Sequence, residues 1–495
     1  MTSTGTHIER YRTLRAELER SILPLAGSVD GRTFTLQAGL EGLQLELGGY
    51  VVLEGGGPPA LGQVRALTAS TMEAGTVGLA GDDASLSARV VIRLAVGSGV
   101  VLDGDPGPFH DRRARPATPD EVRAWAERTA RGSARLPVGT LRLADGVAAE
   151  LDAGGFDRHT FLCGQSGSGK SYSLGLVLEQ LLLRTGLRIV ILDPNSDFAR
   201  FRELRDDADP ELAARWRELA GSFALLEANG EGDDRLKLRL ADLAASHQGA
   251  LLQLDPVADR EEYAELHGLI ATARPESVEE LQGTDRPEAR ALALRIANLG
   301  TASLGVWARG PGRTVLDALA DESVRCLVVD VGSLETQQEQ ALVASAVLDR
   351  LWRLRKGRSP VLLVIDEAHN VCPAAPADPL TALATETAVQ IAGEGRKFGL
   401  HLLVATQRPA KVHENVLSQC DNLILMRMNS PGDAAIVGDT LGFAPPGLVG
   451  RATGFGLGEA LVAGKIASHP ALIRFGRRVT REGGGDVGSD WAAPR

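Results

Sequence analysis

The segment 164–171 constrains this chain more than any other part of it. Its sequence, Gly-Gln-Ser-Gly-Ser-Gly-Lys-Ser, matches the phosphate-binding pattern G-x-x-x-x-G-K-[ST] at every position. Glycines let consecutive backbone N–H groups turn toward phosphates, the lysine neutralises the outer phosphates, and the serine hydroxyl ligates magnesium. The apolar stretch 160–163 before it and the helical pattern at 173–184 after it are the strand and helix that the motif requires. The sequence therefore predicts a nucleoside triphosphate site formed by Gly164, Gln165, Ser166, Gly167, Ser168, Gly169, Lys170, Ser171 and Tyr172.

A second apolar stretch, 361–365, ends in two adjacent carboxylates, Asp366 and Glu367. Because successive side chains of a strand point to opposite faces, the two carboxylates can take different roles. We expect Asp366 to hold magnesium opposite Ser171, and Glu367 to polarise the water that attacks the terminal phosphate. The alternative, an acidic helix start after a buried strand, is weaker because the same chain carries a phosphate-binding loop.

Two polar residues flank a third apolar stretch, 401–405. Gln407 follows this stretch, and at the end of a strand beside the phosphate loop it would hydrogen-bond the terminal phosphate or its attacking water. Arg396 precedes the stretch, so it would lie at the opposite edge of the sheet and reach a neighbouring subunit's site rather than its own. From spacing alone, an ordinary surface arginine is the more common explanation of Arg396.

Length and charge limit the possible architectures and partners. A chain of 495 residues is too long for one compact core and indicates two or three domains. The 53 Lys and Arg against 64 Asp and Glu give no overall positive field, so any contact with nucleic acid must be local, in a groove or channel. The basic run at 350–358 could line a DNA pore, but a cationic helix end before Gly357 and Pro360 explains it better.

Cysteine usage and hydropathy indicate the compartment. The four cysteines are far apart in sequence and form no C-x-x-C pair, which argues against a zinc site and against a disulfide framework. The first 20 residues are polar and charged, and no apolar run is long enough to span a bilayer. We therefore expect a soluble, cytoplasmic protein that does not contact a membrane.

Periodicity divides the first part of the chain into three segments. Residues 1–24 are charged and amphipathic and are expected to be helical. Residues 25–115 alternate polar and apolar positions, which predicts several short strands in a small β-barrel or sandwich. Residues 116–140 are interpreted as a linker whose helix begins at the capping sequence Thr118-Pro119.

The larger part, 141–480, alternates apolar strands with helices, which predicts an α/β domain whose parallel sheet is covered on both faces. The expected strands are 160–163, 187–192, 325–331, 361–365, 401–405 and 422–426. A charged, largely helical segment at about 200–320 is interpreted as an insertion in this domain. The Gly-rich tail, 481–495, has little to bury and is expected to be disordered.

Several further segments together resemble the HerA branch of the HerA/FtsK ATPases. They are DEAHN at 366–370, GRKFG at 395–399, ATQRP at 405–409, VLSQCDN at 416–422, FDRH at 156–159, LDPN at 192–195 and DVGSL at 330–334. The resemblance covers most of residues 140–475. It implies a RecA-like P-loop ATPase domain with a parallel-rich sheet and a helical insertion, preceded by a small N-terminal β-barrel of the type shared with ATP synthase subunits.

The same resemblance implies a function. Members of this kind form a homohexameric ring that binds ATP and Mg²⁺ between subunits and moves duplex DNA through its pore, working with a nuclease or other effector protein. Such a role would serve DNA repair or antiviral defence. The roles carried over by position are phosphate and magnesium binding for Lys170 and Ser171, Walker B chemistry for Asp366 and Glu367, γ-phosphate sensing for Gln407, a trans arginine finger for Arg396, and a second interfacial arginine for Arg158.

Two other functions stay open at this stage. One is an ATP-binding assembly scaffold that organises an effector enzyme in a phage-defence complex without translocating DNA. The other is a conjugation- or secretion-type ATPase related to the VirB and TraG proteins. The absence of a transmembrane segment in the sequence argues against a membrane-embedded coupling protein.

Overall fold

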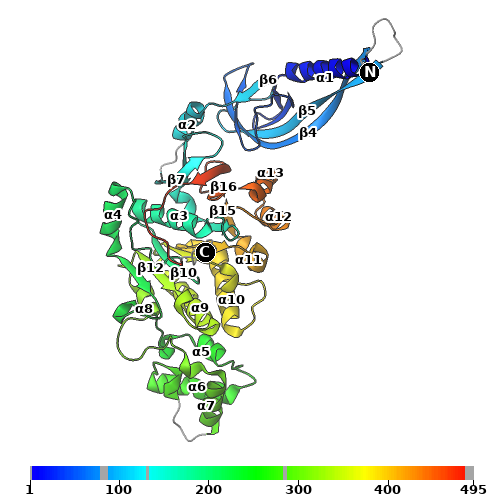
Figure 1. Cartoon of the computed structure of the whole chain (residues 1–495). Helices are drawn as coiled ribbons and strands as arrows, with labels where there is room; N and C mark the ends of the chain where they lie inside the picture. Colours follow the sequence, from blue (N-terminus) through cyan, green and yellow to red (C-terminus); the bar gives the residue numbers. More distant parts are fainter. Residues whose placement is uncertain (1–2, 79–86, 130–132, 282–286, 485–495) are drawn as a thin grey trace, which may run out of the picture.

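The computed structural model describes residues 3–78, 87–129, 133–281 and 287–484. Figure 1 shows an elongated molecule, with a small β-domain at one end, an α/β domain in the middle and a group of helices at the other end. Among the described helices, none is both long and apolar enough to cross a bilayer. Of the tail predicted to be disordered, only residues 481–484 lie within the described ranges.

The N-terminal β-domain is a closed barrel with the strand order β1-β2-β5-β4-β3-β6. Its strands are β1 (Leu25–Ser28), β2 (Thr33–Gly39), β3 (Tyr50–Glu54), β4 (Ala60–Gly78), β5 (Ser87–Val101) and β6 (Phe109–Pro116). Neighbouring strands are antiparallel throughout. Burial alternates along β2, where Phe34, Leu36 and Ala38 face the core and the residues between them are exposed. The alternating sequence of 25–115 thus produces strands with one buried face.

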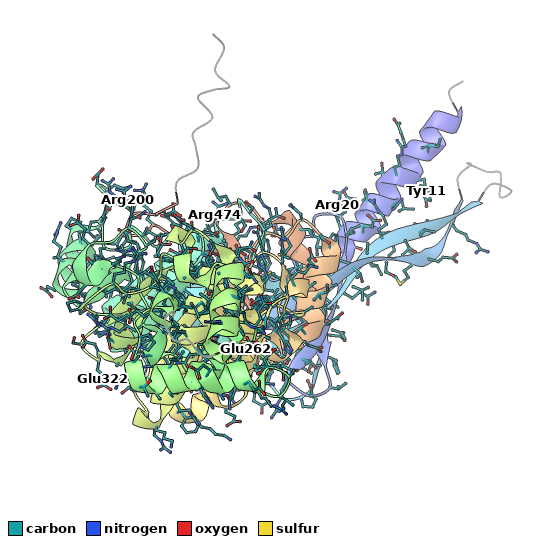
Figure 2. All side chains as sticks on the ribbon, turned by 90° about the horizontal axis from the view of Figure 1, so that it is seen from below. Tyr11, Arg20, Arg200, Glu262, Glu322 and Arg474 are labelled. Atoms are coloured by element: carbon teal, nitrogen blue, oxygen red, sulfur yellow. The ribbon has the colours of Figure 1, made fainter. Side chains whose placement is uncertain are left out.

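Helix α1 (Ser3–Ser21) lies along β4 and β5 where these two strands extend beyond the barrel (Figures 1 and 2). Its apolar side chains, together with Ile22, pack on Val90, Ile92 and Leu94 of β5. The buried Glu19 carboxylate accepts a hydrogen bond from the Arg93 N–H at 2.7 Å. The helix therefore covers one face of an otherwise isolated two-stranded ribbon.

A short helix, α2 (Pro119–Arg128), joins the barrel to the α/β domain. Thr118 caps its N-terminus and Glu121 completes the capping box, so the predicted helix start is confirmed. Nearby, the Tyr50 hydroxyl of the barrel lies 2.7 Å from His469 Nε2 of the α/β domain. Burial lowers the pKa of His469 to about 3, so this imidazole is neutral and the contact is a hydrogen bond rather than an ion pair.

The α/β domain is built on one sheet of eleven strands, in the order β11-β12-β10-β13-β14-β9-β15-β16-β17-β7-β8. They are β7 (Arg135–Leu141), β8 (Ala148–Asp152), β9 (His159–Cys163), β10 (Arg188–Asp193), β11 (Phe223–Leu226), β12 (Cys326–Asp330), β13 (Val361–Ile365), β14 (Leu400–Thr406), β15 (Cys420–Leu425), β16 (Glu459–Gly464) and β17 (Ala471–Phe475). All six strands expected from the sequence are present.

The sheet is parallel-rich, as the resemblance implies, but it is not wholly parallel, which corrects the expectation from strand patterns. Each pair of neighbouring strands is parallel over the first part of the sheet, which comprises β11, β12, β10, β13, β14, β9 and β15. The remaining strands, β16, β17, β7 and β8, each pair antiparallel with the strand before them in the sheet. β16 is as buried and apolar as the parallel strands, so its composition gave no sign of its direction. Direction depends on the connections between strands, which local patterns do not encode.

Helices cover both faces of the sheet. On one face, α3 (Lys170–Arg184) packs against strand residues such as Ile189 and Ile191. On the other, α9 (Gln337–Leu354) and α10 (Pro379–Glu394) pack against the alternate residues Val190 and Leu192. The period-two alternation of a strand buried on both sides thus supplies two separate cores. Helix α9 ends with Arg353 in its last turn, as expected for the basic run at 350–358.

The segment predicted as a helical insertion contains α4 (Pro210–Ala220), α5 (Ala245–Leu251), α6 (Arg260–Ala273), α7 (Pro287–Leu299) and α8 (Val315–Ala320). It is not wholly helical, because β11 within it forms the edge strand of the sheet beside β12. Four residues are too few to show a strand pattern among charged helices. Figure 1 places α5, α6 and α7 at the end of the molecule far from the barrel. The remaining helices, α11 (Glu414–Leu417), α12 (Pro431–Thr440) and α13 (Pro446–Val449), lie between β14 and β16 in the chain.

Candidate functional site

The phosphate-binding loop connects β9 to α3 at the carboxyl edge of the parallel strands. Gly167 and Gly169 have φ angles of 72° and 89°, a left-handed conformation that favours glycine. Gly169 is the N-cap of α3, so the loop leads directly into a helix N-terminus, where backbone N–H groups and the helix dipole favour phosphate. Residues of this loop line a pocket of about 520 Å³, together with Tyr172, Asn195, Asp197, Glu367 and Gln407.

Lys170 is buried at the base of this pocket and paired with both Walker B carboxylates. Its Nζ contacts Asp366 Oδ1 and lies 3.1 Å from Glu367 Oε1. Burial alone would lower the pKa of Lys170, but the two carboxylates raise it above its ordinary value. The lysine is therefore charged, and its charge is balanced by the two acids.

The Ser171 hydroxyl donates a hydrogen bond of 2.6 Å to Asp197 Oδ2. Asp197 follows β10 and was not among the predicted site residues. Burial raises the pKa of Asp197 above its ordinary value, and the bond from Ser171 opposes this shift. The motif at 192–195, which ends two residues earlier, was the available signal for this side of the pocket.

The residues around Ser171 suit Mg²⁺. Asp366 Oδ2 is buried and has no hydrogen-bond partner within the described ranges, so this oxygen is available as a ligand. Ser171, Asp366 and Asp197 are oxygen donors, the kind that magnesium prefers. No cluster of three or more His, Cys, Asp or Glu side chains arranged for a metal occurs in the described part of the chain.

Glu367 is a buried carboxylate beside Lys170 and His369. It follows β13 with a φ of 43°, and its Oε2 lies 3.3 Å from His369 Nδ1. Burial alone would raise its pKa, but the nearby His369 and the charge of Lys170 lower it to about 2. The carboxylate is thus ionised at neutral pH and able to orient and polarise a water.

Gln407 lies where the sequence places it, at the end of β14 and in the lining of the phosphate pocket. The neighbouring Thr406 Oγ1 lies 3.0 Å from His369 Nδ1. The imidazole of His369 therefore connects the Glu367 side of the pocket to the strand that carries Gln407. The structure brings these groups together from β13 and β14, which are paired in parallel.

Arg158 and Arg396 lie at the opposite, amino edge of the sheet, away from the phosphate loop of their own chain. Arg396 Nη1 is 2.8 Å from Asp421 Oδ2, and Arg158 Nε is 3.8 Å from the same oxygen. Both side chains are partly exposed, at 40% and 37%. One carboxylate thus holds the two arginines next to each other at the surface.

Two buried side chains fix the elements that carry these arginines. His159 Nδ1 accepts a hydrogen bond from the Leu402 N–H at 2.9 Å, while its Nε2 lies 3.0 Å from the Ala392 carbonyl. Asn422 Nδ2 donates to the Gly155 carbonyl at 2.9 Å and to Thr160 Oγ1 at 3.0 Å. These bonds join β9, β14, β15 and α10 at this edge of the sheet.

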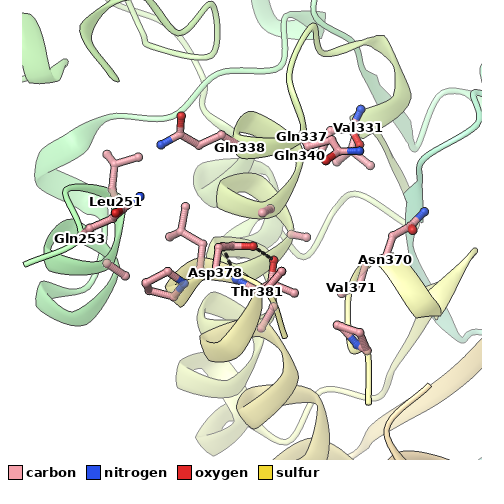
Figure 3. Close-up of a pocket in the computed structure, with 18 of the residues that line it drawn as sticks. Leu251, Gln253, Val331, Gln337, Gln338, Gln340, Asn370, Val371, Asp378 and Thr381 are labelled. Atoms are coloured by element: carbon pink, nitrogen blue, oxygen red, sulfur yellow. Dashed lines mark hydrogen bonds between the residues drawn. The ribbon is translucent and has the colours of Figure 1, made fainter. Parts of the chain in front are cut away.

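A second cavity, of about 700 Å³, is distinct from the phosphate pocket. Figure 3 shows residues that line it. Pro194, Val331 and Asn370 in its wall follow β10, β12 and β13, so it lies at the same edge of the sheet. Its other walls come from α5, α7, α9 and α10. No lysine or arginine of the described ranges lines it, so it has no side chain to neutralise phosphate.

The end of the described chain corrects one prediction. Residues 481–484, expected to be disordered, are ordered against the α/β domain: the Arg481 N–H donates to the Glu203 carbonyl at 2.8 Å and the Gly483 N–H to the Asp197 carbonyl at 2.9 Å. Glu482, Gly483 and Gly484 line the phosphate pocket. A Gly-rich segment has few side chains to bury, but its backbone can still be fixed by hydrogen bonds.

Comparison with known families and proteins identifies chains similar to this one. Residues 136–294 match the family described as "Helicase HerA, central domain". The chain is 25% identical over 397 residues to the DNA double-strand break repair helicase HerA of Pyrococcus furiosus, covering 70% of each chain. It is 33% identical over 168 residues to the same-named protein of Sulfurisphaera tokodaii, covering 32% of this chain and 33% of that one.

Two solved structures have a similar fold. VirB4 of Thermoanaerobacter pseudethanolicus aligns with a TM-score of 0.50 at 17% identity, over 70% of this chain and 98% of the other. The bacterial conjugative coupling protein TrwB, lacking an N-terminal segment, aligns with a TM-score of 0.50 at 14% identity, over 74% and 93%. At these identities the likeness concerns the fold alone.

Proposed function

We propose that this chain, which belongs to the HerA-type ATPases, couples ATP hydrolysis to the movement of duplex DNA. It is an ATP hydrolase, and the observation that carries the proposal is the convergence of Lys170, Asp366, Glu367 and Gln407 around one pocket at the N-terminus of α3. Relatives named as DNA double-strand break repair helicases support DNA as the polymer that is moved.

The residues of the pocket divide the chemistry of hydrolysis. When ATP binds, Lys170 separates from its carboxylate partners and neutralises the outer phosphates. The ionised Glu367, which His369 orients, polarises the attacking water. Gln407 contacts the terminal phosphate or that water. Ser171 and Asp366, with Asp197 beside them, would hold Mg²⁺, which when bound neutralises charge on the phosphate oxygens.

We propose further that the chain assembles into a ring. Arg396 and Arg158 lie together at the edge of the sheet away from their own phosphate loop, and partly exposed. That position suits arginines that complete the site of an adjacent subunit, as in ring ATPases where a finger is supplied in trans. We infer a homohexamer with one site at each subunit boundary.

DNA and an effector protein are the proposed partners of the ring. With a net charge of −11, the chain is expected to hold DNA only in a local channel, the pore of the ring. A nuclease or other effector protein would act on the DNA that the ring delivers, in the cytoplasm and in repair or antiviral defence. The closed barrel at one end of the molecule supports the assignment to the HerA-type ATPases.

The test is the steady-state ATPase rate with and without long duplex DNA, with Lys170→Ala as the blank. The proposal predicts strong stimulation by DNA that the variant lacks. A DNA-independent rate in the wild-type protein would contradict a stand-alone translocase and favour an assembly scaffold. Adding Glu367→Gln separates these functions further, because a scaffold retains effector binding without hydrolysis and a translocase loses its activity.

A further inference from the structure

The segment 408–413 leaves β14 directly after Gln407, and we refer to it as the β14 exit loop. Its sequence is Arg-Pro-Ala-Lys-Val-His. Gln407 lines the phosphate pocket, whereas the side chains of Arg408 and Lys411 are exposed. The loop therefore begins at the ATP site and carries two cations at the surface.

The backbone of the β14 exit loop is fixed. Pro409 and Val412 are buried, and Val412 belongs to the core on the α9 and α10 side of the sheet. The Lys411 N–H donates a hydrogen bond to the Arg408 carbonyl at 3.0 Å. Two cationic side chains thus extend from a backbone that a ligand would not have to order, which lowers the entropic cost of binding.

Both cations are available to an external ligand. Within the described part of the chain, the Arg408 and Lys411 side chains make no hydrogen bond or ion pair. The exit from β13, 371–378, contains no lysine or arginine, and Arg427 after β15 donates to the Gly167 carbonyl at 2.7 Å. Of these three neighbouring exits, the one from β14 thus presents two unpaired cations to an anion.

A chain of polar contacts joins the β14 exit loop to the Glu367 carboxylate. Glu367 Oε2 lies 3.3 Å from His369 Nδ1, and the same nitrogen lies 3.0 Å from Thr406 Oγ1. Thr406 Oγ1 in turn accepts a hydrogen bond from the Arg408 N–H at 3.0 Å. We therefore expect a displacement of Glu367 or Gln407 to move Arg408 as well.

The exit from β13 is hydrogen-bonded to the same loop. The Ala374 N–H donates to the Lys411 carbonyl, and the His413 N–H donates to the Cys372 carbonyl, each at 2.9 Å. The exits from the two strands that lead to the Walker B carboxylates and to Gln407 thus form one connected element of the surface.

The phosphates of duplex DNA are the anions that suit this element. Arginine and lysine side chains supply most of the phosphate contacts of DNA-binding proteins, and arginine can bind a phosphate with two N–H groups. Because the net charge of the chain is −11, contact with DNA has to come from local cations rather than from the overall field. A contact that moves DNA also has to change position during hydrolysis, and this loop is joined to the groups around the terminal phosphate.

We propose that Arg408 and Lys411 bind backbone phosphates of duplex DNA and form a contact through which the ATP site moves the polymer. The inference rests on the duplex DNA of the proposed function and adds residues that hold it. It does not depend on the number of subunits in the ring or on Arg396 acting in trans.

The experiment measures binding of the full chain to labelled duplex DNA by fluorescence anisotropy over a series of potassium chloride concentrations. Magnesium and a non-hydrolysable ATP analogue are present, and the wild-type protein is compared with the double variant Arg408→Ala, Lys411→Ala. Loss of two phosphate contacts should weaken binding equally for duplexes of different sequence. The slope of the logarithm of the association constant against the logarithm of salt concentration should become less negative by about 2 for each subunit that contacts DNA.

Two further double variants separate charge from structure. Arg408→Lys, Lys411→Arg keeps both cations and should keep most of the salt dependence. Lys356→Ala, Arg358→Ala is the matched control, because it removes the same two residue types from exposed positions before β13, at the opposite edge of the sheet. This control should bind DNA as the wild-type protein does. Thermal unfolding that matches wild type shows that each variant folds.

Three results would overturn the inference. The first is an unchanged salt slope in Arg408→Ala, Lys411→Ala, which would mean that DNA binds elsewhere. The second is an equal loss of slope in Lys356→Ala, Arg358→Ala, which would mean that total charge rather than position decides binding. The third is weaker binding of the ATP analogue with unaltered DNA binding, which would place Arg408 or Lys411 on the nucleotide.

The outcome separates this inference from the proposed function. If the wild-type protein binds duplex DNA and the double alanine variant keeps the same salt slope, the residue assignment falls and the proposed function is untouched. If the slope changes as expected while DNA fails to stimulate hydrolysis, the assignment stands and the translocase falls. If the wild-type protein binds no duplex DNA, both fall.

Discussion

Ser171 and Asp197 are joined by a hydrogen bond of 2.6 Å, in which the serine hydroxyl donates to the carboxylate. The serine begins α3 and the aspartate follows β10, so the bond links the phosphate loop to the neighbouring strand of the sheet. It places a third acidic side chain beside the pair formed by Asp366 and Glu367. The bond orients the hydroxyl that is expected to ligate magnesium.

Removing the Asp197 carboxylate should weaken magnesium use. Side chains that orient a metal ligand typically change metal affinity or activity by 10- to 100-fold. We expect Asp197→Ala to raise the magnesium concentration for half-maximal ATPase activity by about 10-fold. Asp145→Ala, at an exposed position, should leave the magnesium titration unchanged. An unaltered titration in Asp197→Ala would mean that the bond has no role in metal binding.

Glu367→Gln should abolish hydrolysis while ATP still binds. Loss of a general base costs about 10²- to 10⁴-fold in rate, and the amide keeps the size of the side chain. Because the pKa of Glu367 is lowered to about 2, its ionisation should add no acidic limb to the rate profile between pH 5 and about 9. Single-turnover hydrolysis and nucleotide binding measure the two effects separately. Glu335→Gln, on an exposed residue, is the control.

Mixing two inactive variants tests whether Arg396 acts in trans. Arg396→Ala should lower the ATPase rate by 10²-fold or more, as expected for an arginine finger, and Lys170→Ala should be inactive. Rings assembled from both variants contain boundaries with an intact loop and an intact arginine. We expect such mixtures to regain activity, whereas Arg353→Ala, altered in the last turn of α9, should stay active alone. Mixtures that remain inactive would argue for a role in cis.

His159 should make stability pH-dependent. Burial lowers its pKa to about 4, below the unfolded value of 6.5, so the folded state disfavours the protonated ring. The contribution of the neutral ring to the free energy of unfolding is complete above pH 6.5. It decreases by roughly 3 kcal/mol as the pH falls toward 4. His159→Asn can retain the bond from the Leu402 N–H but does not titrate. The free energy of unfolding, measured in urea from pH 7 to 5, should fall less steeply for this variant than for the wild-type protein. Equal pH dependence in the two proteins would contradict a titration of His159.

Arg478→Met should destabilise the protein through the buried charge that it leaves on Glu179. Removing one partner of a buried ion pair typically costs about 3–5 kcal/mol. The adjacent Arg477→Met is the matched control, because the Arg477 side chain is 83% exposed. The free energy of unfolding should fall for the first variant and stay near the wild-type value for the second. Equal unfolding curves would mean that the pair adds nothing to stability.

The sequence predicted those parts of the fold and site in which consecutive residues carry the information. Six apolar stretches became the six expected strands, and Thr118 capped the predicted helix. Lys170, Glu367 and Gln407 were placed at strand and helix ends by their motifs, and they meet because parallel strands share their carboxyl edge. Their catalytic roles stay predictions until the variants are measured.

Other parts depended on contacts between distant segments. The antiparallel direction of β16 and β17, the edge strand β11, and the order of residues 481–484 leave no period or motif in the sequence. Asp197 was missed because its contact with Ser171 comes from a folded turn. Glu482 was missed as a pocket residue because it lies about 300 residues further along the chain than the phosphate loop. Asp421 joins Arg158 to Arg396 only in three dimensions.

The sequence alone therefore predicted a phosphate-binding loop at residues 164–171, because glycine conformation, lysine charge and helix start are local properties of a short motif. The tertiary structure decided what surrounds this loop: the Asp197 hydrogen bond, the His369 link and the chain end held by Glu179 and Arg478. These contacts depend on the packing of β10, β13 and the chain end around α3. Packing is set by the whole hydrophobic core rather than by neighbours in sequence.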